Sequence, residues 1–197
     1  MTKPGLLATA AIVATLVSSP AWAPAWADEE IGNVFEREYR GAEGMRVDGE
    51  TRELRWSNPI YSAETVRTDA AEYTELEFAD GTRLTVGENS EVVLDSFVYD
   101  PSSGSGDAVI SFGKGVFRFV AGHMNKEGYE LNTPSATLAI RGTIFRLVID
   151  AILNVELYVE QGTVLIYPCN GEEDVVEAGE YAMMPANCGE HWVRQWS

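Results

Sequence analysis

An alternation of apolar and polar residues with a period of two is the feature that most restricts the fold of this chain. It is clearest where Thr74, Leu76 and Phe78 alternate with Glu75 and Glu77, and it recurs along the later half of the sequence. Successive side chains of a strand point to opposite faces, whereas a helix repeats its apolar residues every 3.6 positions. About a dozen short strands fit the pattern. The chain is therefore predicted to be all-β.

Turn signals separate these segments. Asp80-Gly81 lies between two alternating runs and is typical of a tight hairpin, because both residues tolerate a positive φ. Glycines also open later strands at unequal intervals, at Gly115, Gly142, Gly162 and Gly179. A regular solenoid needs a constant period, so we expect a single-domain, jelly-roll-like β-sandwich with many short strands, and an irregular β-helical stack is the alternative.

The first 27 residues have the features of a signal peptide. Lys3 precedes the apolar run 5–18, which is short for a membrane span, and two small-x-small sites follow, ending at Ala23 and Ala27. The acidic residues directly after Ala27 favour cleavage there. Residues 28–197 are then predicted to form one exported domain, periplasmic and without membrane insertion.

The chain is strongly acidic. It has 31 acidic and 14 basic residues, and loss of Lys3 with the leader changes the net charge from −17 to −18. Such a charge repels nucleic acid and anionic lipid, so neither is expected as a partner. Attraction to a basic protein face is one interpretation of the charge, and a well-solvated surface is the other.

Cys169 and Cys188 are the two cysteines of the chain. An even pair in an exported protein predicts one disulfide, which would restrict the unfolded chain by about 3 kcal/mol. It would also hold the tail with His191, Trp192 and Trp196 against the domain. Two free thiols in the core are the alternative.

Signals for catalysis are few. The two histidines, His123 and His191, are far apart in sequence, and no nucleophile motif such as Gly-x-Ser-x-Gly occurs. A carboxylate pair of the glycosidase type stays open among so many acidic residues. We therefore predict no catalytic residue, no metal ligand and no cofactor.

The segment 133–145 carries the most specific motif. Thr133-Pro134 begins an alternating apolar run that ends in Arg141-Gly142-Thr143 and an aromatic residue, and this closely resembles the signature of the FecR domain. The segments 64–94 and 155–164 follow the order of the same family. The resemblance covers roughly residues 31–185.

The motif also has a physical interpretation. Pro134 suits the first residue of a strand, because it fixes φ and lacks a donor. Gly142 would break the strand with a bulge or corner. Arg141 is expected to have a structural role, bonding to carbonyl oxygens or to Asp150, and binding of a partner's carboxylate or phosphate is the alternative.

The resemblance implies a periplasmic β-domain that receives a signal from an outer-membrane transporter and passes it to a sigma-factor regulator. Because no membrane span or cytoplasmic region is recognised here, we expect a stand-alone, non-catalytic module that contacts an envelope protein in sensing or signalling. Tyr61, Tyr99 and Tyr129 are candidate contact residues. A passive scaffold that binds polysaccharide or peptidoglycan is the alternative, with Trp56 and Trp192 stacking on sugar rings or filling the core.

Overall fold

A computed structural model describes residues 29–36, 41–125 and 128–196. These residues form strands and turns without a helix, which confirms the all-β prediction. None of them belongs to a helix that could cross a lipid bilayer. The predicted leader and its cleavage site, Ala27, lie outside the described residues. The strands are β1 (Glu30–Val34), β2 (Glu43–Met45), β3 (Thr51–Glu53), β4 (Pro59–Tyr61), β5 (Glu64–Arg67), β6 (Thr74–Phe78), β7 (Arg83–Val86), β8 (Glu91–Asp100), β9 (Ser105–Phe112), β10 (Gly115–Val120), β11 (Tyr129–Asn132), β12 (Ala136–Ile149), β13 (Val155–Pro168), β14 (Asp174–Glu177), β15 (Glu180–Met184) and β16 (Trp192–Gln195).

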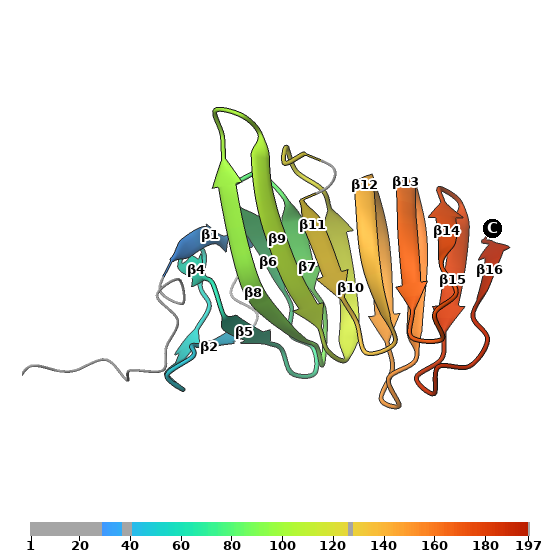
Figure 1. The fold of residues 1–197 in the computed structure, drawn as a ribbon. Coiled ribbons are helices and arrows are strands. Elements are labelled where there is room, and N and C mark those ends of the chain that lie inside the picture. The colour runs from blue at the N-terminus through green and yellow to red at the C-terminus, as the bar shows by residue number, and fades with distance from the viewer. Residues whose placement is uncertain (1–28, 37–40, 126–127, 197) are drawn as a thin grey trace, which may run out of the picture.

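The strands form one sheet that folds over into two walls (Figure 1). Wall A runs in the order β3-β2-β5-β8-β9-β11, continues through the first half of β12 and the second half of β13, and ends at β14. Wall B runs in the order β4-β1-β6-β7-β10, continues through the other halves of β12 and β13, and ends at β15 and β16. Of the pairings described, only β9 with β11 is parallel, so a regular parallel β-helix is not formed.

The two long strands β12 and β13 pass from one wall to the other. The register between them shifts around Arg141–Ile144, where Gly142 has a φ of 61° and Gly162 a φ of 80°. A Cβ atom on Gly162 would lie 2.7 Å from the carbonyl oxygen of Gly142. Glycine is therefore required where the strands bend. Gly142 produces the predicted bulge, but β12 continues through it, so the expected break of the strand is wrong.

The inner faces of the two walls enclose one hydrophobic core. Aromatic rings from opposite walls meet in it, with Phe78 stacked on Phe97 at a centroid distance of 5.0 Å and Phe112 edge-on to Phe117 at 4.9 Å. Burial alternates along most strands, as in Thr74–Phe78 of β6. The period of two in the sequence therefore reports which side chains fill the space between the walls.

Two local predictions have different outcomes. The hairpin at Asp80-Gly81 is confirmed, since β6 and β7 pair on either side of it, and Gly81 has a φ of 83°. The position of Pro134 at the start of a strand is wrong, because β12 begins at Ala136 and Pro134 lies in the preceding turn. Thr133 closes that turn with three hydrogen bonds to the backbone of Ala136, in which its own amide and hydroxyl donate and its hydroxyl also accepts.

Candidate protein-binding surface

The structure places the Arg141-Gly142-Thr143 motif at the bend of β12. Arg141 is exposed and makes no hydrogen bond or ion pair with any residue that the structure describes. The contact that we considered with Asp150 is not formed, because the Asp150 carboxylate accepts from the backbone of Ile152 and Asn154. Thr143 is buried, and its hydroxyl has no hydrogen-bond partner among the residues that the structure describes. The motif therefore shapes the bend, and Arg141 stays available on the surface.

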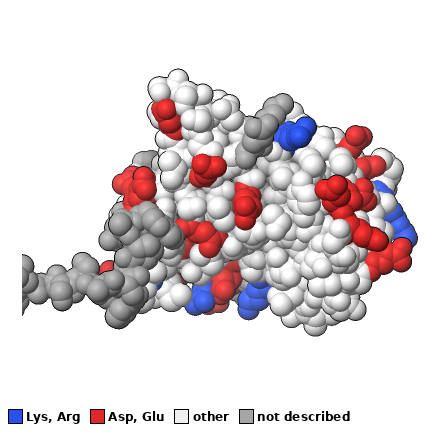
Figure 2. Space-filling model, in the orientation of Figure 1, with Lys and Arg blue, Asp and Glu red and all other residues white. Residues whose placement is uncertain are grey.

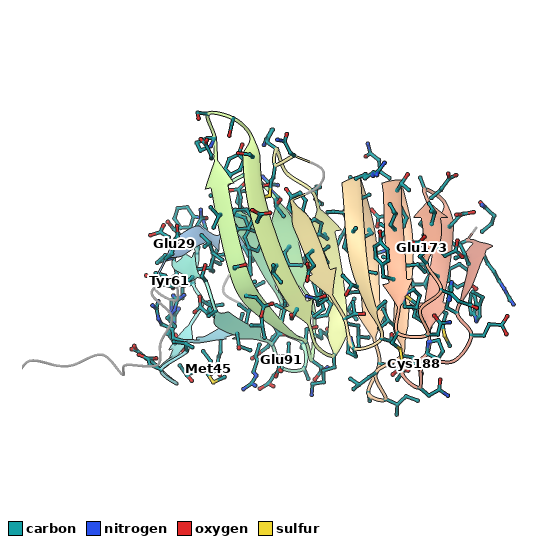
Figure 3. The ribbon with its side chains drawn as sticks, in the orientation of Figure 1. Glu29, Met45, Tyr61, Glu91, Glu173 and Cys188 are labelled. Carbon is teal, nitrogen blue, oxygen red and sulfur yellow. A yellow bond between two sulfur atoms is a disulfide. The ribbon has the colours of Figure 1, made fainter. Side chains whose placement is uncertain are left out.

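The predicted disulfide is confirmed. Cys169 and Cys188 are joined with their Cα atoms 5.2 Å apart, which links the turn after β13 to the segment before β16. Figure 3 shows Cys188 at the lower edge of the molecule. Nearby, Nε2 of His191 lies 3.5 Å from the Asp174 carboxylate. The C-terminal segment is thus held against wall A, while β16 pairs with β15 of wall B.

The outer face of wall B carries an aromatic cluster made by Tyr158, Tyr181, Trp192 and Trp196. The two tyrosine rings stack at 5.3 Å, and each tryptophan meets one of them edge-on. The Arg146 guanidinium lies 5.5 Å from both the Tyr158 and the Trp196 ring centroids. A hydrogen bond to Glu156 raises the pKa of Tyr158. The rings contact one another and two arginines, Arg146 and Arg194, so they fix β16 in place.

The aromatic residues that we proposed as contacts are distributed differently. Tyr129 is buried, so its prediction as an exposed contact residue is wrong. Tyr61 and Tyr99 are half-buried, and the guanidinium carbon of Arg46 lies 3.9 Å from the Tyr61 ring centroid. Trp56 is 55% exposed, in the turn before β4. The structure does not bring these side chains together into one site.

The hydroxyl of Tyr129 instead donates a short hydrogen bond to the carboxylate of Asp80, which is buried at the β6–β7 hairpin. The same carboxylate accepts from the amide and the hydroxyl of Thr82 and from the amide of Met124. Burial and this hydrogen bond raise the pKa of Tyr129, which keeps its hydroxyl as a donor. The network ties the hairpin of wall B to β11 of wall A.

The outer face of wall A carries a different surface. One outward position on each of five neighbouring strands lies in register with the next, and we call this set the wall A row: Val109, Glu130, Ala139, Leu165 and Val175. Four of the five residues are apolar, and Val175 is 45% exposed. Outward positions of a solvated sheet are usually polar. The row is therefore a candidate contact surface for another molecule.

Two shallow recesses lie along the wall A row. One, of about 310 Å³, lies over β9, β11 and β12 and reaches Ala139 and Tyr167. The second, also of about 310 Å³, is lined by Leu165, Val175 and two acidic residues, Glu173 and Asp174. Because Ala139 and Leu165 are paired in register, the two recesses follow each other along the row.

Carboxylates flank the wall A row. Asp107 and Glu130 line the first recess, and Glu173 and Asp174 line the second. Figure 2 shows the same face with separate acidic groups on a largely uncharged surface and with basic groups near its margins. Among the described residues, no group of three His, Cys, Asp or Glu side chains is placed to hold a metal ion. The surface offers apolar contact and negative charge.

Sequence reasoning missed the wall A row. The signal was present, because Ala139 and Leu165 are apolar residues between apolar neighbours, but a strand buried on both faces gives the same pattern. Only the pairing of β9, β11, β12, β13 and β14 shows that these residues share one outward face.

Comparisons with known proteins address the family. Two crystal structures, at 1.65 and 2.50 Å resolution, of a protein described as a "putative anti-sigma factor from Parabacteroides distasonis" match with a TM-score of 0.54 and 15% identity. The match covers 66% of this chain and 59% of that protein, and at this identity it shows a shared fold. No curated protein sequence matches the chain. The family model described as FecR protein matches residues 64–165, more than half of the sequence, so the chain belongs to the FecR family.

Proposed function

We propose that the protein is an exported, non-catalytic FecR-like module that contacts another protein in cell-envelope sensing or signalling. The observation that carries this proposal is the wall A row, an outward-facing and mainly apolar strip with carboxylates along it, in which Val175 is exposed and the other apolar residues are half-buried. Membership of the FecR family and the fold shared with a protein described as an anti-sigma factor support a regulatory module.

The proposed compartment is the periplasm. The disulfide between Cys169 and Cys188 supports a location outside the cytoplasm, because such bonds persist in oxidising compartments. The leader expected in residues 1–27, with cleavage after Ala27, supports export. Mass spectrometry of the protein purified from its own cells tests this directly, since cleavage predicts a mature N-terminus at Asp28.

A non-catalytic role is supported by the positions of the two histidines. The Nδ1 atom of His123 lies 2.8 Å from the backbone oxygen of Asp80, and His191 faces Asp174 across the C-terminal segment. Both imidazoles therefore have structural contacts. Zymography on envelope polysaccharides is the corresponding test, and we expect no cleavage.

A passive scaffold for polysaccharide or peptidoglycan is the second candidate. The aromatic cluster on wall B favours it, because tyrosine and tryptophan rings are suited to stacking on sugars. The same rings already pack on one another and on Arg146, however, which explains their presence without a ligand. We therefore place contact with a protein first.

Crosslinking in living cells tests the proposal. A photoreactive amino acid is placed at Val175 on wall A or, as a matched position on wall B, at Val116, which is similarly exposed. We expect one defined envelope protein to be captured from Val175 and not from Val116. Recovery of a transporter or a sigma regulator would support signalling. Recovery of only peptidoglycan-associated or polysaccharide-export components from both positions would instead support the scaffold.

A further inference from the structure

We propose that the wall A row binds a segment of a partner protein in which apolar side chains alternate with lysine or arginine. This inference rests on the proposed function, because it names the chemistry of the partner at that surface. Three properties of the surface agree with such a segment: its shape, its charge, and the lack of cover by any residue that the structure describes.

The shape suits a short segment. Neighbouring strands lie about 4.8 Å apart, so the wall A row extends for about 19 Å from β9 to β14. An extended segment of about six residues covers that length. The small side chain of Ala139 lies between Glu130 and Leu165 and leaves depth at the centre of the row. The two recesses on the row can each receive an apolar side chain of such a segment.

The corresponding positions of wall B are covered by the protein itself. There, Arg118, Arg146 and Tyr158 lie in register, and the Arg146 guanidinium lies over the Tyr158 ring. Arg118 and Arg146 are both paired with Glu160. No cation–ring contact among the described residues involves Tyr167 of wall A. At these corresponding positions, wall B therefore carries arginines and a covered tyrosine ring, whereas wall A carries apolar side chains.

The charge selects the partner. Among the described residues, Asp107 and Glu173 have no ion pair, and the side chain of Glu130 accepts only from Asn132. Exposed ion pairs contribute little to affinity, so apolar burial would supply most of it. The carboxylates would instead accelerate association with a basic segment and reject an acidic one.

The same charge disfavours other occupants. In a symmetric pair of copies, each wall A would face the identical surface, which would oppose the carboxylates of one copy with those of the other. Anionic lipid would be repelled for the same reason. A basic segment of a different protein is the occupant that the charge favours.

Peptide binding tests the inference. The probe is a fluorescent peptide of alternating lysine and valine, its counterpart contains glutamate in place of lysine, and binding is followed by fluorescence anisotropy. We expect the lysine peptide to bind and the glutamate peptide to bind about tenfold more weakly or not at all. Reversing two charges of the row, with Asp107→Lys and Glu130→Lys together, should weaken binding of the lysine peptide about tenfold.

Two further variants separate docking from general attraction to an acidic protein. Glu88→Lys makes the same kind of charge reversal in the exposed turn between β7 and β8, and it should leave binding nearly unchanged. Leu165→Thr introduces a residue that is well suited to a β-strand and removes apolar surface from the row, so it should weaken binding about fivefold. Thermal unfolding of each variant verifies that the domain is intact.

The inference would be overturned by the absence of binding to the lysine peptide. It would equally be overturned by binding that Leu165→Thr leaves unchanged, or by equal losses in Glu88→Lys and in the Asp107→Lys, Glu130→Lys pair. The proposed function is judged separately by crosslinking in cells. A signalling protein captured there, together with no peptide binding, would reject the basic segment and retain the protein contact.

Discussion

Two buried carboxylates, Glu64 in wall A and Asp80 in wall B, are stabilised in different ways. Glu64, at the start of β5, is fully buried and faces a cation, with Nη2 of Arg52 2.7 Å from its Oε1 atom and Nε at 3.0 Å. It also accepts from the amide of Tyr61. Within the described part of the chain, the Asp80 carboxylate accepts from neutral donors of Thr82, Met124 and Tyr129 and has no cation beside it.

The difference shows where each region is sensitive. In a buried ion pair, the carboxylate depends on a single residue, because loss of the cation leaves a buried negative charge without compensation. A network of neutral donors distributes it, because each donor supplies one of several hydrogen bonds. The β2–β5 end of wall A should therefore respond strongly to a single substitution and to pH, and the Asp80 hairpin should respond in smaller steps.

The largest effect is expected for Arg52→Ala, which leaves Glu64 buried without its cation. We expect a loss of about 3 kcal/mol in the free energy of unfolding at pH 7, measured by urea titration. Arg52→Lys is the matched control. Lysine retains the positive charge but cannot make the bidentate contact of the guanidinium. A loss of unfolding free energy as large as that of Arg52→Ala would contradict the role of charge.

The dependence on pH sharpens the same comparison. Burial raises the pKa of Glu64 above its ordinary value of 4.5, and Arg52 opposes the shift. A carboxyl group whose pKa is raised by folding contributes stability that is present below the unfolded value and lost as the pH rises through the folded value. Without Arg52 the shift should grow, so the deficit of Arg52→Ala should be larger at pH 7 than at pH 4. Equal deficits would show that lost packing, rather than charge, causes the effect.

A middle-sized effect is expected for Asp80→Asn. Asparagine has an NH₂ group in place of one carboxylate oxygen. This group is itself a donor, so it faces the neighbouring N–H and O–H donors without accepting a hydrogen bond from them. We expect a loss of about 2 kcal/mol in unfolding free energy, smaller than for Arg52→Ala. A loss larger than that of Arg52→Ala would reverse the comparison between the two regions.

Tyr129→Phe should cost about 1 kcal/mol, since it removes one of the donors to Asp80 and retains the ring. That ring meets Phe119 edge-on at a centroid distance of 5.8 Å, and this contact survives the substitution. Chemical denaturation of the single variants and of the double variant with Asp80→Asn measures the coupling. Strictly additive losses would show that the short contact contributes nothing of its own.

The smallest effect is expected at Thr143, whose buried hydroxyl has no hydrogen-bond partner in the described part of the chain. Thr143→Val should change the unfolding free energy by less than about 0.5 kcal/mol or stabilise the protein, because no hydrogen bond is lost. Thr143→Ala is the control, and it should cost about 1 kcal/mol, because its lost methyl group leaves space beside Gly162. A clear loss in Thr143→Val would reveal a partner for the hydroxyl.

Local signals in the sequence account for much of the fold. Alternation identified the strand Thr74–Phe78, and the pair Asp80-Gly81 identified its hairpin, because both depend on neighbouring residues. The disulfide followed from two cysteines. Pro134 was misplaced, since a fixed φ suits the turn before a strand as well as its first residue.

The contacts that join distant segments could not be predicted in the same way. Arg52 and Glu64 meet through the pairing of β2 with both β3 and β5, and no local pattern marks them as partners. The wall A row depends on the register of five strands from different parts of the chain. Such arrangements are set by tertiary pairing, which periodicity does not report.

The two long strands that pass between the walls have a consequence for cooperativity. Since β12 and β13 each belong to both walls, neither wall can open by itself without disrupting a strand that the other needs. The amides of Val159 in wall B and Val164 in wall A should therefore exchange with solvent in the same opening event. A partner that binds wall A would slow amide exchange in wall B as well. Binding on one face would thus stabilise the opposite face, because both walls share the backbone of β12 and β13.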